Sequence, residues 1–499
     1  MPFLRRVLLS LLMCLAARSA AAETTLNVAV VGLPRVQGHP YAVSNLPAIY
    51  VFTAIYDALT FVDNDGSLKP WLATSWTQTG DLTWEFTLRP NVMFSNGEPL
   101  DAEAVVASID YLTSPAARSD TSAAELSSIV GARVLGPLTV EITTGSPNPI
   151  LPREVSALRV IAPRHWAAVG PGGYARDPVG TGPFQVERWT AARVDLKAYR
   201  QSWRPPKLDR LTIRALPEMT ARVQGLISGQ IDVALALRVE DKDVIEAAGH
   251  RFQADPGTGV FVIALNAERD ERLRDVRVRE ALNLAVDRER ISQVMLGGLV
   301  HPASQFTPPN ANGYDPMLKP YPYDPDRARA MLTEAGYPDG FSFVFEGVMG
   351  GAVSDSALFQ QIASDLAKVG VTMEIRPIML SQLSANMHSP SGWTGSAFGV
   401  DYGTAPSLDS LRALKQHSCL HIYKWFCDAE GFPVLEAALA AHTEDERVSL
   451  TKQVFRRYYD LYPAILLWDI VYFEGVRKEV GDVPAVGSWI VYDQIEKKQ

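Results

Sequence analysis

The sequence of 499 residues lacks the short motifs by which many secreted enzymes can be identified. It contains neither the G-x-S-x-G turn of serine hydrolases nor the H-E-x-x-H zinc motif, and it has no box of paired carboxylates. A secreted enzyme is therefore a distant alternative. The sequence predicts neither a catalytic residue nor a cofactor.

Long apolar runs are also missing, with one short exception at the start of the chain. Arg5 and Arg6 precede an apolar stretch over 7–17, whose length of about 11 residues is well short of the roughly 20 that span a bilayer. Small residues up to Ala22 then provide a cleavage site. We expect residues 1–22 to be a signal peptide cut after Ala22, which leaves a soluble mature chain in the periplasm.

Basic side chains are fewer than acidic ones, with 47 Lys and Arg against 56 Asp and Glu and a net charge of −9. Because residues 1–22 contain three arginines and no acid, their removal changes the net charge to −12. An acidic protein is a poor partner for nucleic acid or anionic membranes. We therefore expect no nucleic-acid partner, whereas a cationic or zwitterionic ligand is compatible with this charge.

Cysteine is scarce, and only Cys419 and Cys427 remain once the signal peptide is removed. An even number of cysteines in an oxidising compartment favours a disulfide, which would stabilise the fold by roughly 2.5 kcal/mol through loop closure. Two alternatives stay open. In the first, the two cysteines bind a metal ion together with His417 and His421, since these four possible ligands lie within eleven residues. In the second, both thiols are free. The disulfide is the favoured interpretation, and no metal site is predicted.

The chain is too long for a single hydrophobic core, so two or three domains are expected. The stretch 260–298 is its most informative part. Residues 261–265 are all apolar, the pattern of a strand buried on both faces. Apolar residues then recur with helical spacing from Val278 to Val286, and Asp287 is placed to cap a second short helix. Strand, charged turn and two helices indicate a docking unit of an α/β domain rather than a catalytic motif.

Residues 266–291 read N-x(8)-D-V-R-V-R-E-A-L-N-L-A-V-D-R-E-R-I, and this string resembles the central signature of the family 5 extracellular solute-binding proteins. These proteins are the receptors of ABC importers for dipeptides, oligopeptides and nickel. Further stretches resemble other boxes of the family in the same order along the chain, namely 65–108, 178–189, 221–233, 323–341 and 445–463. The resemblance thus covers nearly the whole mature chain.

The resemblance implies an α/β fold of two lobes, the class II periplasmic-binding-protein fold, with an extra α+β subdomain in the first lobe. It assigns residues 23–50 and 178–264 to the first lobe and residues 51–177 to a subdomain inserted in that lobe. Residues 265–470 form the second lobe, and residues 471–499 return to the first lobe. It further implies a monomer that captures a solute between its lobes and delivers it to ABC permease subunits in the inner membrane.

A di- or oligopeptide is the solute that the resemblance favours. An opine, an oligosaccharide, nickel or haem are alternatives on the same fold, as is presentation of the ligand to a chemoreceptor.

Residues 389–409 combine aromatic residues, glycines and an acid in an apparent loop, which suits a binding cleft better than a core. In peptide-binding members of the family, a [WF]-x-x-D-Y segment supplies an aspartate for the α-ammonium group of the ligand. Phe398 to Tyr402 matches this form, so the resemblance makes Asp401 the candidate ammonium partner, with Phe398 and Tyr402 beside the ligand.

A second alignment of the same region is possible. Gly392 and Trp393 match the family form G-W-x-x-D, and Ser396 then stands in the place of the acid. The two alignments exclude each other. Near the end of the chain, Trp489 is a further candidate contact in the cleft.

Overall fold

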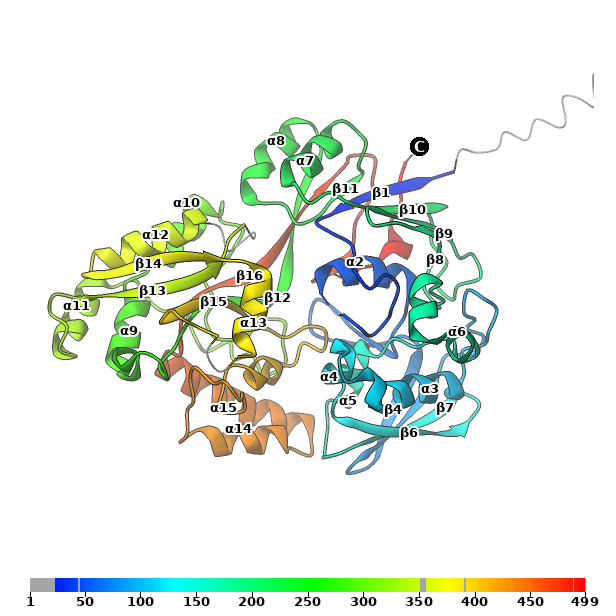
Figure 1. Cartoon of the computed structure of the whole chain (residues 1–499), viewed down its shortest axis with the longest axis horizontal. Coiled ribbons are helices and arrows are strands. Elements are labelled where there is room, and N and C mark those ends of the chain that lie inside the picture. The colour runs from blue at the N-terminus through cyan, green and yellow to red at the C-terminus, as the bar shows by residue number, and fades with distance from the viewer. Residues whose placement is uncertain (1–22, 44, 351–355, 390–391, 488, 499) are drawn as a thin grey trace, which may run out of the picture.

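The computed structural model describes residues 23–43, 45–350, 356–389, 392–487 and 489–498. The expected signal peptide lies outside the described residues. Two lobes are arranged side by side and are joined by two long strands that run through both of them (Figure 1). These strands are β12 (Arg251–Leu265) and β16 (Ala464–Val476), which pair antiparallel. The two-lobed α/β architecture predicted from the sequence is confirmed.

A single ten-stranded sheet extends through both lobes in the order β14-β13-β15-β12-β16-β11-β1-β10-β9-β8. In the first lobe, β1 (Thr25–Val30) lies parallel to β10 (Arg210–Ala215) and to β11 (Val233–Ala234). Helix α7 (Met219–Ile227) connects β10 to β11, as expected for parallel strands, which need a crossover. The hairpin of β8 (Phe184–Trp189) and β9 (Arg193–Ala198) forms the edge of the sheet.

A smaller antiparallel sheet forms the extra part of the first lobe. Its strand order is β4-β5-β7-β6, with the bounds Ala73–Gly80, Thr83–Leu88, Thr139–Thr144 and Ile129–Gly136. Helix α3 (Ala102–Thr113) packs on it, and the Asp101 carboxylate caps this helix by accepting the N–H of Ala104 at 3.0 Å. Trp76 and Trp84 are partly buried against the first-lobe core, so they are packing residues.

The turn at 178–183 leads into strand β8 of the main sheet and packs against the end of helix α2 (Leu46–Ile55). Gly182 donates its N–H to the carbonyl of Ile55 at 2.9 Å. A Cβ on Gly180 would lie 1.9 Å from that same carbonyl oxygen, so no larger side chain fits there. The glycines of this turn therefore serve close packing.

The second lobe contains parallel strands β13 (Phe341–Val348) and β14 (Val371–Ile378) with helices on both faces of the sheet. Aspartates cap three of its helices: Asp275, Asp287 and Asp324 precede α9 (Val276–Leu284), α10 (Arg288–Met295) and α11 (Pro325–Glu334), and the cap at Asp287 is the one expected from the sequence. The remaining helices of the lobe are α12 (Ser356–Ala367), α13 (Leu380–Met387), α14 (Phe432–Leu439) and α15 (Glu444–Leu461). None of the described helices is long and apolar enough to cross a membrane.

The expectation that residues 389–409 form a loop is wrong for its central part. Residues Ala397–Gly403 form strand β15, which lies between β12 and β13 in the interior of the sheet. Gly399 allows this close packing, because a Cβ there would lie 3.2 Å from the ring of Phe261 and 3.3 Å from the ring of Phe345. The glycines that resemble a loop are therefore required by neighbouring aromatic rings.

Candidate functional site

A pocket lies where the two lobes meet. Its walls come from the first lobe, from the crossing strand β12, from the second lobe and from the returning C-terminal segment, and its lining residues are Phe61, Val62, Ser156, Thr258, Ala405, Pro406, Leu408, Val486 and Trp489. Most of these side chains are apolar. A solute in this pocket would contact both lobes at once, as expected of a ligand that favours closure.

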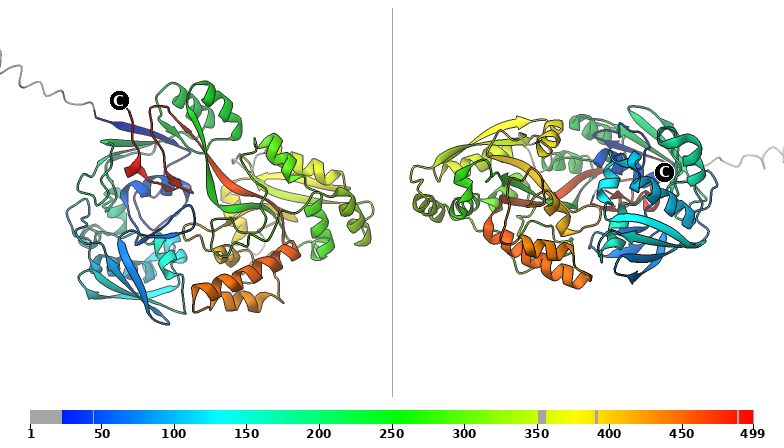
Figure 2. Two further views of the ribbon diagram at one scale, coloured as in Figure 1. Left: turned by 180° about the vertical axis from the view of Figure 1, so that it is seen from behind. Right: turned by 60° about the horizontal axis from the view of Figure 1, so that its bottom comes forward.

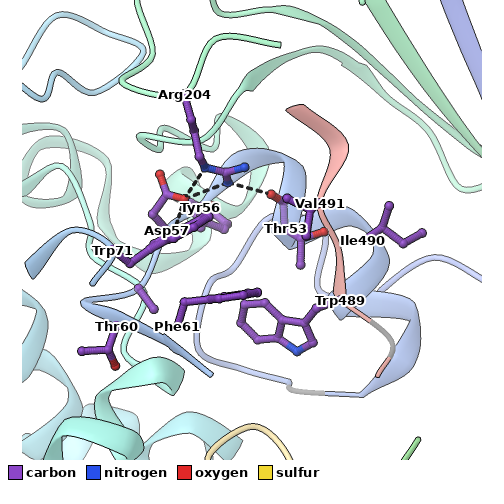
Figure 3. A pocket seen from close by; sticks show the side chains of 11 residues that line it. Thr53, Tyr56, Asp57, Thr60, Phe61, Trp71, Arg204, Trp489, Ile490 and Val491 are labelled. Carbon is purple, nitrogen blue, oxygen red and sulfur yellow. Dashed lines mark hydrogen bonds and ion pairs between the residues drawn. The ribbon is translucent and has the colours of Figure 1, made fainter. Parts of the chain in front are cut away.

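An inner pocket adjoins the first one and shares with it the side chains of Phe61 and Trp489 (Figure 3). Strand β2 (Thr60–Val62) carries Phe61, whereas Trp489 begins the short strand β18 (Trp489–Ile490), which pairs with β17 (Ala485–Val486). Both aromatic rings therefore stand between the two pockets. Trp489, a candidate cleft contact from the sequence, lines both pockets, and its contact with a solute stays a prediction.

Asp57 organises the wall of the inner pocket. Its carboxylate is 3% exposed and accepts four side-chain hydrogen bonds, from Trp71 Nε1 at 2.8 Å, Thr181 Oγ1 at 2.7 Å, Trp203 Nε1 at 2.9 Å and Arg204 Nε at 2.8 Å. Arg204 donates to the carbonyl of Thr53 (Figure 3) and also pairs with Asp493. A carboxylate with this many donors is fully satisfied, so we assign Asp57 to the architecture of the pocket rather than to the ligand.

Asp401 differs from Asp57, because the described residues give its carboxylate neither a hydrogen bond nor an ion pair. It lies on β15 opposite Phe261 of β12. Burial among the surrounding atoms raises the pKa of Asp401 to about 6, although part of the side chain is exposed to solvent. An unneutralised carboxylate beside the crossing strands can receive a positively charged group.

The other candidates on this segment are packed within the second lobe. Phe398 is 0% exposed and stacks on Trp393 with a centroid distance of 3.7 Å, and Tyr402 is 1% exposed and stacks on His417 at 3.8 Å. In this conformation these rings support the strand and present no surface to a solute. The hydroxyl of Ser396 hydrogen-bonds to Asp270.

Strand alternation places Asp401 apart from these rings. Successive side chains of a strand point to opposite faces, so Asp401 points away from Phe398 and Tyr402. Of the two alternative alignments, the first places at position 401 a carboxylate without a partner among the described residues. The second places at position 396 a serine whose hydroxyl already bonds to Asp270.

Cys419 and Cys427 are joined in a disulfide in the structure. Of the two neighbouring histidines, His417 is 1% exposed, and burial lowers its pKa to about 3. Among the described residues, no group of three His, Cys, Asp or Glu side chains is arranged to hold a metal ion.

Contacts across the mouth of the cleft hold the lobes together, and the sequence carries no signal for them. Arg412 of the second lobe pairs with Glu125 of the first through two hydrogen bonds, one of which is 2.9 Å from Nε to Oε2. Arg153 of the first lobe pairs with Glu444 at the start of α15 at 3.0 Å. Figure 2 shows α14 and α15 beside the smaller sheet of the first lobe from two further directions.

Comparison with known proteins gives relatives along most of the chain. The glutathione-binding protein GsiB of Salmonella paratyphi A is 29% identical over 397 residues, which cover 74% of this chain and 75% of that protein. GsiB of Escherichia coli K12 is 28% identical over 395 residues, with the same coverage of 74% and 75%.

Solved structures share the fold of this chain. The substrate-binding protein CtaP of Listeria monocytogenes superimposes with a TM-score of 0.83 at 18% identity, covering 96% of this chain and 100% of that one. DppA of Helicobacter pylori, solved with the peptide STSA, gives a TM-score of 0.78 at 19% identity and covers 96% and 99%.

The profile of the bacterial extracellular solute-binding proteins, family 5, matches residues 67–410. The relatives of this chain are binding proteins of ABC importers and not enzymes. Proteins of this family are periplasmic. The chain therefore belongs to the family 5 bacterial extracellular solute-binding proteins, the periplasmic substrate-binding components of ABC importers.

Proposed function

We propose that the solute of this protein is a short peptide or a peptide-like molecule with a free α-ammonium group, and that Asp401 binds this group. The observation that carries the proposal is the Asp401 carboxylate, which is partly exposed, has no partner among the described residues and has a pKa raised to about 6 by burial. Pairing with an ammonium group would favour the ionised form of this carboxylate.

The apolar pocket between the lobes supports the same proposal. Micromolar affinity requires about −8 kcal/mol, and a single ion pair does not provide this. Phe61, Leu408 and Trp489 come from three separate parts of the chain and line this pocket, whose lining does not include Asp401, so the solute must extend beyond the pocket to reach the carboxylate. The relatives named glutathione-binding protein and the neighbour solved with a peptide agree with a peptide-like solute.

We further propose that the mature protein begins after Ala22, acts as a monomer and binds no nucleic acid. The short apolar segment before Ala22 supports the first statement, and the net charge of −12 that remains after its removal supports the last.

Native mass spectrometry of the protein purified from the periplasm, before and after mild unfolding, tests the nature of the solute. Co-purified short peptides or glutathione are the expected result. An opine, an oligosaccharide, haem or a nickel complex would refute the peptide proposal and leave the transport role intact.

Asp401→Asn tests the assigned residue, and the chain offers a matched control in Asp469. The Asp469 carboxylate also has a pKa raised by burial, to about 7, but this residue pairs with Val260 on β12, next to Phe261, and so points to the opposite face of the sheet from Asp401. Asp401→Asn should weaken peptide binding, whereas Asp469→Asn should not. The reverse pattern would assign the ammonium group to Asp469.

A further inference from the structure

Arg412 connects the strand that carries Asp401 to the opposite lobe. It lies on the 3-10 helix Ser410–Lys415 of the second lobe, and its Nη1 donates to the carbonyl of Gly403, the last residue of β15, at 3.1 Å. The same guanidinium donates to both carboxylate oxygens of Glu125, at the end of helix α4 (Thr121–Glu125) of the first lobe. One side chain thus bridges the end of the candidate binding strand and the far side of the cleft.

The geometry of this contact makes it stronger than a typical surface ion pair. A planar guanidinium that meets a carboxylate with two parallel hydrogen bonds is the favourable arrangement for this pair. The side chains of Arg412 and Glu125 are 31% and 18% exposed, so water and salt screen them only in part. The third hydrogen bond, to Gly403 of the same lobe, holds the guanidinium in the direction of Glu125.

The surroundings of the pair belong to both lobes. Arg412 and Glu125 line a polar pocket at the interface together with Glu154 and Ala157 of the first lobe and Pro406, Ser407, Asp409 and Lys415 of the second. Asp409 is already neutralised by Arg447 at 2.8 Å. Glu154 accepts hydrogen bonds from Ser128 and Asn148 within the first lobe. Glu125 is therefore the carboxylate of this pocket to which Arg412 is bonded.

Other contacts close the same side of the cleft. Arg153 pairs with Glu444 and donates to the carbonyl of Gly66 at 2.8 Å. A small apolar cluster joins Val62 of the first lobe to Ala311 and Leu408 of the second. The Arg153–Glu444 pair and the apolar cluster require the lobes to be together, because their partners lie on different lobes, whereas the bond to Gly66 holds Arg153 within the first lobe.

We propose that Arg412 and Glu125 form a latch that stabilises the closed state, so that Arg412 is a positioning residue for solute binding. It raises affinity without touching the solute, because every closed complex must break the latch before the solute leaves. The latch follows from the two-lobed binding function and is independent of whether the solute is a peptide.

Small-angle X-ray scattering of the ligand-free mature protein tests the latch without any solute. Arg412→Gln and Glu125→Gln should each lower the ratio of closed to open molecules about fivefold, the upper range for a partly exposed ion pair. The doubly exchanged variant Arg412→Glu with Glu125→Arg should recover part of the lost closed population. Raising the salt concentration should open the wild type and leave the single variants nearly unchanged.

A matched control lies within one lobe. Arg133 and Glu141 form another pair with two hydrogen bonds, at 2.6 and 3.0 Å, between neighbouring strands of the smaller sheet. Arg133→Gln should leave the scattering unchanged. If Arg412→Gln scatters like Arg133→Gln and like the wild type in low salt, the latch does not exist.

Binding kinetics with glutathione as the probe give a second test. Arg412→Gln should raise the dissociation rate constant about fivefold, because the closed complex opens more readily once the latch is lost. An unchanged dissociation rate would overturn the proposal. Failure of the wild type to bind glutathione would count against the peptide-like solute only, since the scattering experiment still decides on the latch.

Discussion

Peptide affinity should fall as the pH is lowered through 6, because Asp401 must be ionised to pair with an α-ammonium group. Burial raises the pKa of this carboxyl to about 6 from an ordinary value of 3.8. A bound ammonium group favours the ionised carboxylate, so binding lowers the pKa of Asp401 and releases a proton when the free protein is protonated. Binding is therefore strongest above pH 6 and weakens below it.

The magnitude follows from the pKa. At pH 7.5 nearly all molecules of the free protein carry an ionised Asp401, whereas at pH 5 roughly one in ten does, so affinity should drop about tenfold between these pH values. Asp401→Asn replaces a hydrogen bond to a charged group, a change of about 1.5–3 kcal/mol, or about 10- to 150-fold in affinity at pH 7.5. The pH dependence should disappear in this variant.

Isothermal titration calorimetry with the peptide Ser-Thr-Ser-Ala and with glutathione measures both effects, and buffers of different ionisation enthalpy report the released protons. N-acetylation of the tetrapeptide removes the ammonium group, so it should weaken binding to the wild type and have little effect on Asp401→Asn. The control Asp469→Asn should keep the affinity and its dependence on pH. Equal affinity at pH 5 and pH 7.5, or a pH dependence that survives in Asp401→Asn, would refute the role of Asp401.

Three further predictions concern stability. Burial raises the pKa of Glu474, which is 2% exposed, to about 8, so the folded state loses stability as the pH rises from about 4.5 to 8. Glu474→Gln should therefore stabilise the protein at pH 9 by on the order of 2 kcal/mol and have little effect at pH 4. Equal shifts of the melting temperature at both pH values would contradict this. Replacing Cys419 and Cys427 by serine should lower the free energy of unfolding by about 2.5 kcal/mol in denaturant titrations, and an unchanged midpoint would show that the loop needs no closure. Gly399→Val should destabilise by about 1–3 kcal/mol, since its side chain meets two aromatic rings, and a stable variant would argue against tight packing at β15.

Helices with local signals could be predicted from the sequence. Each of Asp101, Asp275, Asp287 and Asp324 precedes an apolar stripe of helical spacing, and each accepts a backbone N–H at the start of a helix. The cap and the stripe lie within one or two turns of each other, so neither depends on the rest of the fold.

The crossing strands were predicted only in part, because their identity depends on distant partners. Residues 261–265 are apolar and predict a strand, but β12 begins at Arg251 and includes Asp255, Pro256 and Gly257, residue types that are uncommon in strands. These residues become a strand because β16 pairs with them, with a register shift between Pro256 and Val260. Strand β15 was missed for a similar reason.

The walls of the site could not be predicted, since they are built from pairs that are far apart along the chain. Asp57 meets Thr181 and Arg204, and Glu125 meets Arg412, at separations of more than a hundred residues. Each of these residues is an ordinary polar side chain in its local sequence. One chain without aligned relatives offers no signal for such pairs, whereas Asp401 became a candidate because a family motif surrounds it.

The chain that links Asp401 to Arg412 explains how binding and closure act together. Asp401 lies two residues before Gly403, whose carbonyl orients the guanidinium of Arg412, and Arg412 reaches Glu125 on the other lobe. The proposed solute contact with Asp401 and the proposed latch both form in the closed state. Both therefore shift the equilibrium between open and closed lobes toward the closed state, so each raises the apparent strength of the other. The free energies lost in Asp401→Asn and Arg412→Gln should then add when each acts only on the closed state. A loss in the double variant smaller than the sum would mean that β15 itself shifts when the latch is broken, so that Arg412 also positions the carboxylate of Asp401.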